Sequence, residues 1–275
     1  MSNSVTTFIS TDKEVANNES RISICLRTNG FSFSVTTIDK ELLTFGEAEV
    51  DLNQPFKQLS QAIMDIFAQK GISTFGNKEA RLVVCSEHFV WIPAHLYESS
   101  RDRQYLRMTS WPESHLGVYH AFSDATKSYN VFSASSDVVT AFKLAIPGID
   151  VVSQHWVLAN EELMKRSAQH PVMLMHVREG VGDFEAFYNG QLLLSNSFAA
   201  INDSELLYHS LEVMKTMHLE TPDMELAICG NVGREIYSLL QHYFPNVTLF
   251  TGQQFHYSNP EFQTFHSYRH ALLLS

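Results

Sequence analysis

Two acidic side chains flank a glycine pair past the middle of the chain, and this spacing could support metal or phosphate chemistry. Glu179 and Asp183 stand on either side of Gly180-Val181-Gly182. Carboxylate oxygens are ligands that Mg²⁺ prefers, and glycines let backbone N–H groups come close to a phosphate. Two simpler interpretations stay open, because acids beside a hairpin are more often solvated and such glycines more often only permit a tight turn.

A second glycine-bearing turn, Leu26 to Ser32, lies in the first half of the chain and contains Gly30 but no carboxylate. Arg27 stands in this turn, and Arg178 stands in the corresponding turn of the second half. Guanidinium groups bind carboxylates and phosphates through paired hydrogen bonds. The two arginines could therefore face a shared cleft and bind an anion. The alternative is a pair of unrelated surface arginines.

The thirteen histidines raise the question of a metal centre. His266 and His270 are four residues apart on an expected helix, and His256 lies upstream. Zinc needs three or four converging ligands, and no cysteine or acid is placed to complete this set. The sequence also lacks a P-loop, a G-x-S-x-G elbow and an H-E-x-x-H pair. We therefore expect no metal site and no enzyme of these classes.

The elements that would position the two turns follow one order, βββαβαβα, in each half of the chain. In the second half, three strands over 171–198 precede a helix capped by Asn202 and a strand over 224–229. A helix, a strand and a closing helix from about 260 to 273 complete it, with Pro260 at a typical first helical position. The strand over 224–229 leads directly into Gly230-Asn231.

The first half has three strands over 21–50, a helix and a fourth strand. An insertion at about 87–127 follows, and the repeated order resumes with a strand near 130–134. We expect a flexible tail over 1–20, a first domain over 21–168 and a second domain over 169–275. An internal duplication is the simplest explanation, and convergence of common α/β patterns is the alternative.

The composition of the chain limits the kinds of partner and the cellular location that we expect for it. The 275 residues are 44% hydrophobic and carry 30 acids against 19 bases, for a net charge of −11. This charge argues against nucleic acid as a partner, and no apolar stretch is long enough to insert into a membrane. The polar N-terminus lacks a signal-peptide core, and Cys25, Cys85 and Cys229 lie in apolar runs typical of buried thiols. We expect a cytoplasmic protein.

Four segments carry a resemblance to a known group of proteins: RLVVCSEHFVWIPAHLY, YNVFSASSDVVTAFKLAIPGIDV, LAICGNVGREIYSLL and NPEFQTFHSYRHALLL. Over about 21–275 the chain resembles an uncharacterised bacterial family of unknown function with an actin-like ATPase fold. It is also similar to the actin-like scaffold proteins of type IV pilus and type II secretion machines. The resemblance implies a duplicated ribonuclease-H-like fold, as in actin, Hsp70 and the sugar kinases, with an α/β insertion in the first half.

In the resembling ATPases, two glycine-bearing turns bind phosphates, an aspartate in each turn holds Mg²⁺, and adjacent glycines after a strand contact adenosine. Here the first turn lacks the aspartate, the second has its acid shifted, and Cys229-Gly230-Asn231 keeps one glycine. Hydrolysis is therefore not expected, and weak ATP binding is left open. The residues that the resemblance places at a nucleotide are Gly30, Glu179, Gly180, Gly182, Asp183, Gly230 and Asn231.

These observations predict a pseudo-ATPase that acts as a protein-binding or scaffold module without a cofactor. Aromatic residues outside the expected core are candidates for the surface that contacts a protein partner. They are Trp91 and Trp111 in the insertion, and Phe255 and Tyr257 in a loop near the C-terminus. The alternative is an ATPase or kinase-like enzyme that uses Glu179 and Asp183 in place of the usual aspartates.

Overall fold

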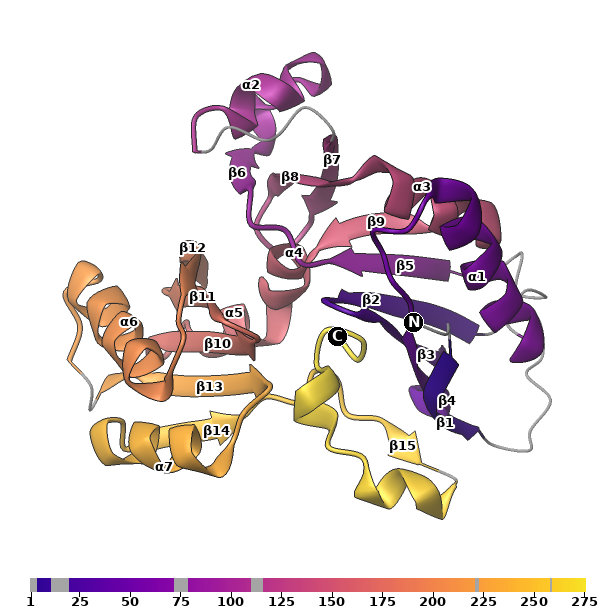
Figure 1. Ribbon diagram of the computed structural model, residues 1–275. Coiled ribbons are helices and arrows are strands. Elements are labelled where there is room, and N and C mark those ends of the chain that lie inside the picture. Colours follow the sequence, from indigo (N-terminus) through magenta and orange to yellow (C-terminus); the bar gives the residue numbers. More distant parts are fainter. Residues whose placement is uncertain (1–3, 11–19, 72–78, 110–115, 221–222, 258) are drawn as a thin grey trace.

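The structure is a computed structural model that describes residues 4–10, 20–71, 79–109, 116–220, 223–257 and 259–275. Three sheets organise this part of the chain (Figure 1). The first sheet has the order β1-β4-β3-β2-β5-β9, with β15 paired to β4. Its strands are β1 (Ser4–Ser10), β2 (Ser20–Arg27), β3 (Gly30–Thr37), β4 (Glu41–Glu49), β5 (Glu79–Val84), β9 (Asp150–Ser153) and β15 (His256–Tyr257).

The second sheet has five strands in the order β12-β11-β10-β13-β14. They are β10 (Val172–Arg178), β11 (Val181–Tyr188), β12 (Gln191–Ala199), β13 (Glu225–Gly230) and β14 (Asn246–Leu249). In both halves the first three strands pair antiparallel, and the fourth and fifth add in parallel on the far side of the first. The predicted duplicated ribonuclease-H-like order is confirmed, because β4-β3-β2-β5-β9 repeats the order of the second sheet.

Helices cover the outer face of each of these sheets (Figure 1). On the first sheet, α1 (Phe56–Gln69) and α3 (Ser136–Ala145) pack against an apolar cluster that includes Phe31, Phe67 and Phe142. On the second sheet, α6 (Asp203–Thr216) and α7 (Arg234–Tyr243) cover a separate cluster. The Asn202 side chain caps α6 as predicted, by accepting a hydrogen bond from the backbone N–H of Glu205.

A third apolar cluster lies between the two sheets and joins them. Phe45 and Val83 of the first sheet contact the same cluster as Leu174 and Phe187 of the second. The connection between the halves, α4 (Gln154–Leu158) and α5 (Glu161–Arg166), contributes Leu158 and other residues to it. The sheets therefore pack through a shared core, and the cleft described below opens where this core ends.

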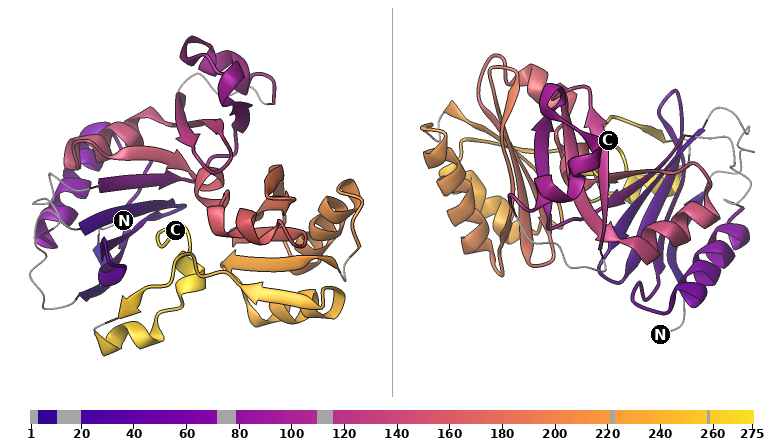
Figure 2. Two further views of the ribbon diagram at one scale, coloured as in Figure 1. Left: turned by 180° about the vertical axis from the view of Figure 1, so that it is seen from behind. Right: turned by 90° about the horizontal axis from the view of Figure 1, so that it is seen from above.

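The insertion forms a three-stranded sheet of its own, in the order β6-β8-β7. It consists of β6 (Phe89–Pro93), β7 (Leu116–Ser123), β8 (Ser128–Ser135) and the short helix α2 (Asp102–Leu106). Figure 2 shows this unit projecting from the body of the molecule. The prediction that the strand near 130–134 resumes the repeat is wrong, because β8 pairs with β6 and β7 and not with the first sheet. The insertion thus extends past residue 127.

Two terminal segments also differ from expectation. Ser4–Ser10, predicted as part of a flexible tail, is an edge strand paired antiparallel with β4, with Val5 and Ile9 packed on apolar clusters. The predicted closing helix is instead two 3₁₀ turns, Pro260–Thr264 and Ser267–His270, because Phe265 adopts an extended backbone between them. This segment packs in the cluster between the sheets, and β15 before it pairs with β4 of the first sheet.

We expect Phe262→Ala to destabilise the protein, because this ring is 1% exposed within the cluster between the sheets. Truncating a buried phenylalanine costs about 3–5 kcal/mol of unfolding free energy. Chemical denaturation measures the loss, and Tyr208→Ala, at a position 58% exposed on α6, is the matched control. A Phe262→Ala variant as stable as the control would contradict the placement of this segment in the core.

Candidate functional site

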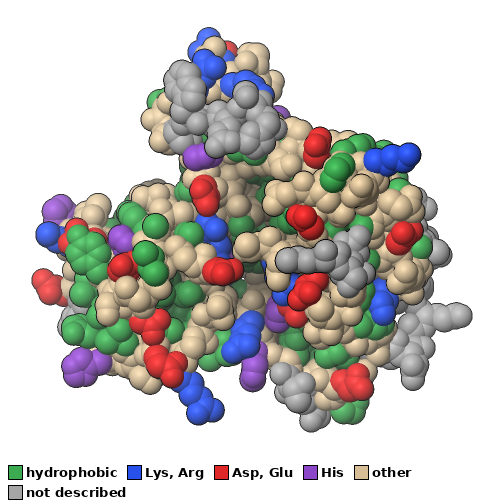
Figure 3. Space-filling model, viewed as in Figure 1, with side chains coloured by type: hydrophobic (Ala, Val, Ile, Leu, Met, Phe, Trp, Pro, Cys, Tyr) green, Lys and Arg blue, Asp and Glu red, His purple; other side chains and the backbone are tan. Residues whose placement is uncertain are grey.

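A cleft of about 1150 Å³ lies between the first and second sheets. The carboxyl ends of β2 and β5 point toward it from one side, and those of β10 and β13 from the other (Figure 1). The space-filling view shows the molecule hollowed between its two lobes, with side chains of both charges along the hollow (Figure 3). Ligands of open α/β sheets bind at carboxyl ends of strands, so this is the candidate functional site.

Both glycine-bearing turns reach this cleft. Arg27 and Asn29 line it from the β2–β3 turn, and Arg178 and Glu179 line it from the β10–β11 turn. Gly230 and Asn231 line it after β13. The other predicted nucleotide residues, which are Gly30, Gly180, Gly182 and Asp183, lie in the same turns and strands but are not among the lining residues.

Two of the glycines are required by close backbone packing. Gly30 and Gly230 both have positive φ, of 149° and 87°. A Cβ at Gly30 would overlap the carbonyl oxygen of Ala48, and one at Gly230 would overlap that of Val177. Their identity is therefore explained by the crossing of neighbouring chain segments, without a phosphate.

The arginines of the two glycine-bearing turns are each paired with a carboxylate of their own half. Arg27 Nη1 lies 2.6 Å from Glu47 Oε1 on β4. Arg178 makes a two-pronged contact with Asp183 on β11, with its Nε and Nη2 at 3.0 Å and 3.2 Å from the carboxylate oxygens. The arginines thus line one cleft, which is one of the two possibilities that the sequence left open, and their charges are compensated by internal acids.

Asp183 is fully buried beneath the cleft, on the face of β11 that is turned toward the first half of the chain. Besides Arg178, its carboxylate contacts His176 Nδ1 at 3.0 Å and accepts a hydrogen bond from Ser197 Oγ at 2.6 Å. Burial alone would raise the pKa of this carboxyl. The His176 hydrogen bond and the charges of His155, His176 and Arg178 outweigh burial and hold the pKa well below its usual range. Asp183 is therefore a structural anion.

A second buried acid, Glu185, extends this network toward the insertion. Glu185 Oε1 lies 2.5 Å from His155 Nδ1 of α4 and accepts a hydrogen bond from Ser195 Oγ at 3.0 Å. The indole N–H of Trp91, on β6, donates to the same Ser195 Oγ at 3.1 Å. Burial raises the pKa of Glu185 to about 7. Trp91, predicted as a partner-surface residue, is half-buried and joins the insertion to the second sheet.

Gln154 completes the network by connecting it to the wall of the cleft. Its side-chain amide exchanges two hydrogen bonds of 2.8 Å with the backbone of Ser86, and its Nε2 lies 3.5 Å from Asp183 Oδ1. Sequence reasoning missed this network. The available signal was the placement of Asp183 and Glu185 two apart in one strand, on the face opposite Phe184 and Ala186.

The described residues contain no group of three or more His, Cys, Asp or Glu side chains arranged to hold a metal ion. Glu179, which lines the cleft together with Glu47 and Glu87, stands in the exposed β10–β11 turn. A magnesium–nucleotide site needs several charge-neutralising groups together. The acids near the turns are instead paired internally or solvated.

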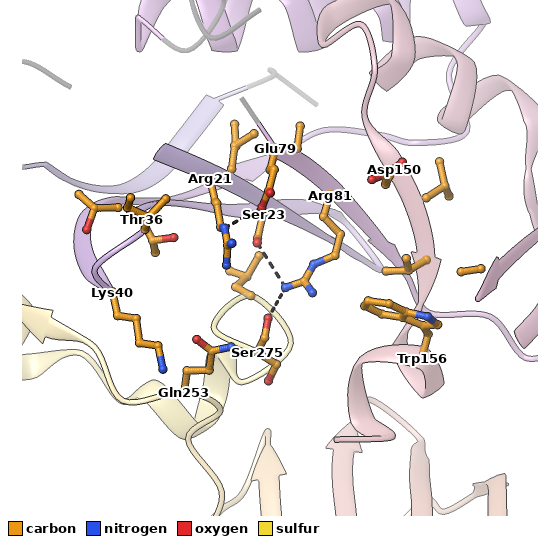
Figure 4. A pocket seen from close by; sticks show the side chains of 18 of the residues that line it. Arg21, Ser23, Thr36, Lys40, Glu79, Arg81, Asp150, Trp156, Gln253 and Ser275 are labelled. Carbon is orange, nitrogen blue, oxygen red and sulfur yellow. Dashed lines mark hydrogen bonds and ion pairs between the residues drawn. The ribbon is translucent and has the colours of Figure 1, made fainter. Parts of the chain in front are cut away.

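A second cavity, of about 540 Å³, lies beside the opposite ends of β2 and β5 (Figure 4). Arg81 projects into it and donates to Ser23 Oγ at 3.5 Å and to the carbonyl oxygen of Ser275. Burial lowers the pKa of Arg81 to about 10. Arg21 and Glu79 form an ion pair of 2.7 Å at its rim. Through its hydrogen bond to Ser275, Arg81 of the first sheet contacts the C-terminal segment at this cavity.

The remaining predicted partner-surface residues have different surroundings. Phe255 lines the second cavity and packs on the cluster between the sheets. Tyr257 is 40% exposed on β15, with its ring 6.0 Å from that of Phe262. Trp111 lies outside the described residues. No helix in the described ranges is long and apolar enough to cross a membrane.

Comparison with known proteins agrees with this architecture. A family model described as a protein of unknown function, DUF3822, matches residues 10–247. No curated protein matches the sequence. A structure from Bacteroides thetaiotaomicron, of a protein with actin-like ATPase fold and unknown function, has a TM-score of 0.72 at 23% identity and covers 85% of this chain and 91% of its own.

A structure of the PilM-PilN type IV pilus biogenesis complex is also similar, with a TM-score of 0.58 at 11% identity, covering 94% of this chain and 97% of its own. The chain belongs to the DUF3822 family and has the actin-like ATPase fold, as its sequence resemblance implied.

We expect Asp183→Ala to destabilise the protein strongly and Glu179→Ala to leave its stability nearly unchanged. Removing one partner of a buried ion pair costs about 3–5 kcal/mol, because it leaves Arg178 and His176 without their counter-charge. The exposed Glu179 is the matched acid in the same turn. Urea titration of both variants checks this, and equal stabilities would refute the structural role of Asp183.

The depressed pKa of Asp183 also predicts an acid-sensitive fold. The folded state holds this group ionised to lower pH than the unfolded state does. Its contribution to stability is therefore present above about pH 4, the unfolded pKa, and is lost as the pH falls through the folded pKa. Unfolding free energy measured between about pH 5 and pH 2 should decline more steeply for wild type than for Asp183→Asn. Parallel declines would contradict the assignment.

Proposed function

We propose that this protein is a non-catalytic, protein-binding module of the actin-like ATPase fold. The observation that carries the proposal is the internal pairing of the arginines in the two glycine-bearing turns. Asp183 is buried against Arg178 and His176, and Arg27 is paired with Glu47. An active ATPase needs acids free to hold a metal and cations free to contact phosphates. Here those groups stabilise the fold.

The chain is proposed to consist of two ribonuclease-H-like domains, about 21–168 and 169–275, with the insertion in the first. The repeated strand order of the two large sheets supports this division. The balance of 30 acids over 19 bases supports a protein that does not bind nucleic acid, and the free Cys25, Cys85 and Cys229 support a cytoplasmic location. The alternative enzyme would use Glu179 with Asp183, and the burial of Asp183 weighs against it.

A protein partner is proposed for the insertion, which projects from the body of the molecule (Figure 1). Leu96 and Met108 are 60% and 75% exposed on it. Exposed apolar side chains on a projecting unit are typical of protein contacts. The similar PilM structure is itself a complex with another protein.

Calorimetric titration with Mg²⁺–ATP tests the non-catalytic part of the proposal. We expect no saturable heat at micromolar nucleotide, because the described residues hold no group of three or more His, Cys, Asp or Glu side chains arranged to bind the metal. A tight, Mg²⁺-dependent isotherm that Glu179→Ala weakens would instead support the enzyme alternative. ATP hydrolysis measured on the same samples should not exceed the buffer blank.

Affinity purification from native cell lysate tests the protein-binding part. The wild-type chain should retain a specific protein, and the double variant Leu96→Glu, Met108→Glu should lose it. Leu144→Glu is the matched control, since Leu144 is 55% exposed on α3, away from the insertion sheet. Loss of the protein from all variants equally, or from none, would rule out the insertion as the contact surface.

A further inference from the structure

Two of the three cysteines lie together at the wall of the central cleft, and neither takes part in the buried charge network. Cys25 is near the carboxyl end of β2, and Cys85 directly follows β5. The strands pair in parallel with Cys25 opposite Val83, so Cys85, two residues further, has its side chain on the same face. Both thiols contact one acceptor, the carbonyl oxygen of Leu26, at 3.6 Å and 3.9 Å.

Their surroundings differ from those of the third cysteine. Cys85 is half-buried and lines the cleft. Cys229 lies near the carboxyl end of β13, is fully buried, and has a raised pKa because of burial. A buried thiol with a raised pKa is unreactive, whereas an accessible thiol beside cations reacts as the thiolate.

The charges that face Cys85 favour ionisation. A hydrogen bond with Cys25 and the nearby charges of His176 and Arg178 on β10 lower its pKa to about 7, against burial and Asp183 of β11. The same hydrogen bond and burial raise the pKa of Cys25, although Arg27 and Arg178 oppose this. Cys85 is therefore the thiol of the pair that ionises more readily, and Cys25 is the one that stays protonated.

We propose that Cys25 and Cys85 form a redox-active dithiol in the cleft wall, which hydrogen peroxide or a small organic peroxide converts to a disulfide. The Cys85 thiolate attacks one peroxide oxygen, the O–O bond breaks, and hydroxide or alkoxide leaves. The resulting sulfenic acid is attacked by the Cys25 sulfur, the S–O bond breaks, and the hydroxyl leaves as water with the Cys25 proton. Each sulfur loses one electron, and the peroxide gains two.

The consequence is local to the cleft. A disulfide would bind the ends of β2 and β5 together at the first glycine-bearing turn, beside Arg27. It would also remove the thiolate that faces His176 and Arg178. This site does not depend on the proposed partner or on the absence of nucleotide, so it can be tested independently of the proposed function.

The test is peroxide treatment of the full-length chain at pH 7, followed by alkylation of the remaining thiols and peptide mass spectrometry. A Cys25–Cys85 crosslinked peptide that dithiothreitol reverses is expected, with Cys229 still alkylated only after unfolding. Overoxidation of Cys85 without a crosslink, disulfides between separate chains, or oxidation of Cys229 at the same rate would overturn the proposal.

Variants separate the two roles. Cys25→Ala should leave Cys85 as a sulfenic acid that dimedone traps, and should slow its alkylation at pH 7 by roughly tenfold, because alanine removes the hydrogen bond and an ordinary thiol of pKa near 8.5 is only a few per cent ionised there. Cys229→Ala is the matched control and should still form the crosslink. An alkylation rate of Cys85 unchanged in Cys25→Ala would refute the positioning role of Cys25. The wild-type peptide map decides the crosslink even if a variant folds poorly.

Discussion

The arrangement of the two halves depends on the buried pairing between Asp183 and its cations. An ionised carboxylate in an apolar interior is costly unless it is paired and hydrogen-bonded. Arg178, His176 and Ser197 meet this requirement within the second sheet, and Gln154 connects the same carboxylate to the backbone of Ser86 in the first half. A shift of one sheet against the other would lengthen or break these hydrogen bonds and ion pairs. The network therefore restricts the relative position of the two sheets.

Apolar packing supplies the free energy that this polar network does not. The cluster between the sheets draws on both halves and on the C-terminal segment, with Leu272, Leu273 and Leu274 all buried. Polar networks favour one arrangement over others, while the burial of apolar surface drives association. The C-terminal segment is therefore part of the packed contact between the halves. β15, which precedes it, pairs with β4 and adds a direct backbone contact with the first sheet.

The repeated strand order and the capped helices could be predicted from the sequence, since both depend on local periodicity and on residues such as Asn202. Three features could not. β1 is polar and alternates weakly, so only its pairing with β4 identifies it. β8 has the pattern of any buried strand, and its choice of partners is a tertiary effect. The 3₁₀ turns after Asn259 follow from packing of Phe262 and Phe265, which overrides a strong helix-start signal.

At the site, the sequence identified the turns but not the state of their charges. A shared cleft for Arg27 and Arg178 was one of two possibilities left open by the sequence. Their carboxylate partners lie 20 and 5 residues away, on strands that pairing brings alongside. These two ion pairs join each turn to a neighbouring strand of its own sheet. The cleft is lined as well by Glu87, Glu179, Asn231 and Arg269, for which no such pairing follows from strand order. Charged groups at the ends of strands can therefore stabilise a fold, and the fold by itself does not decide what its cleft does.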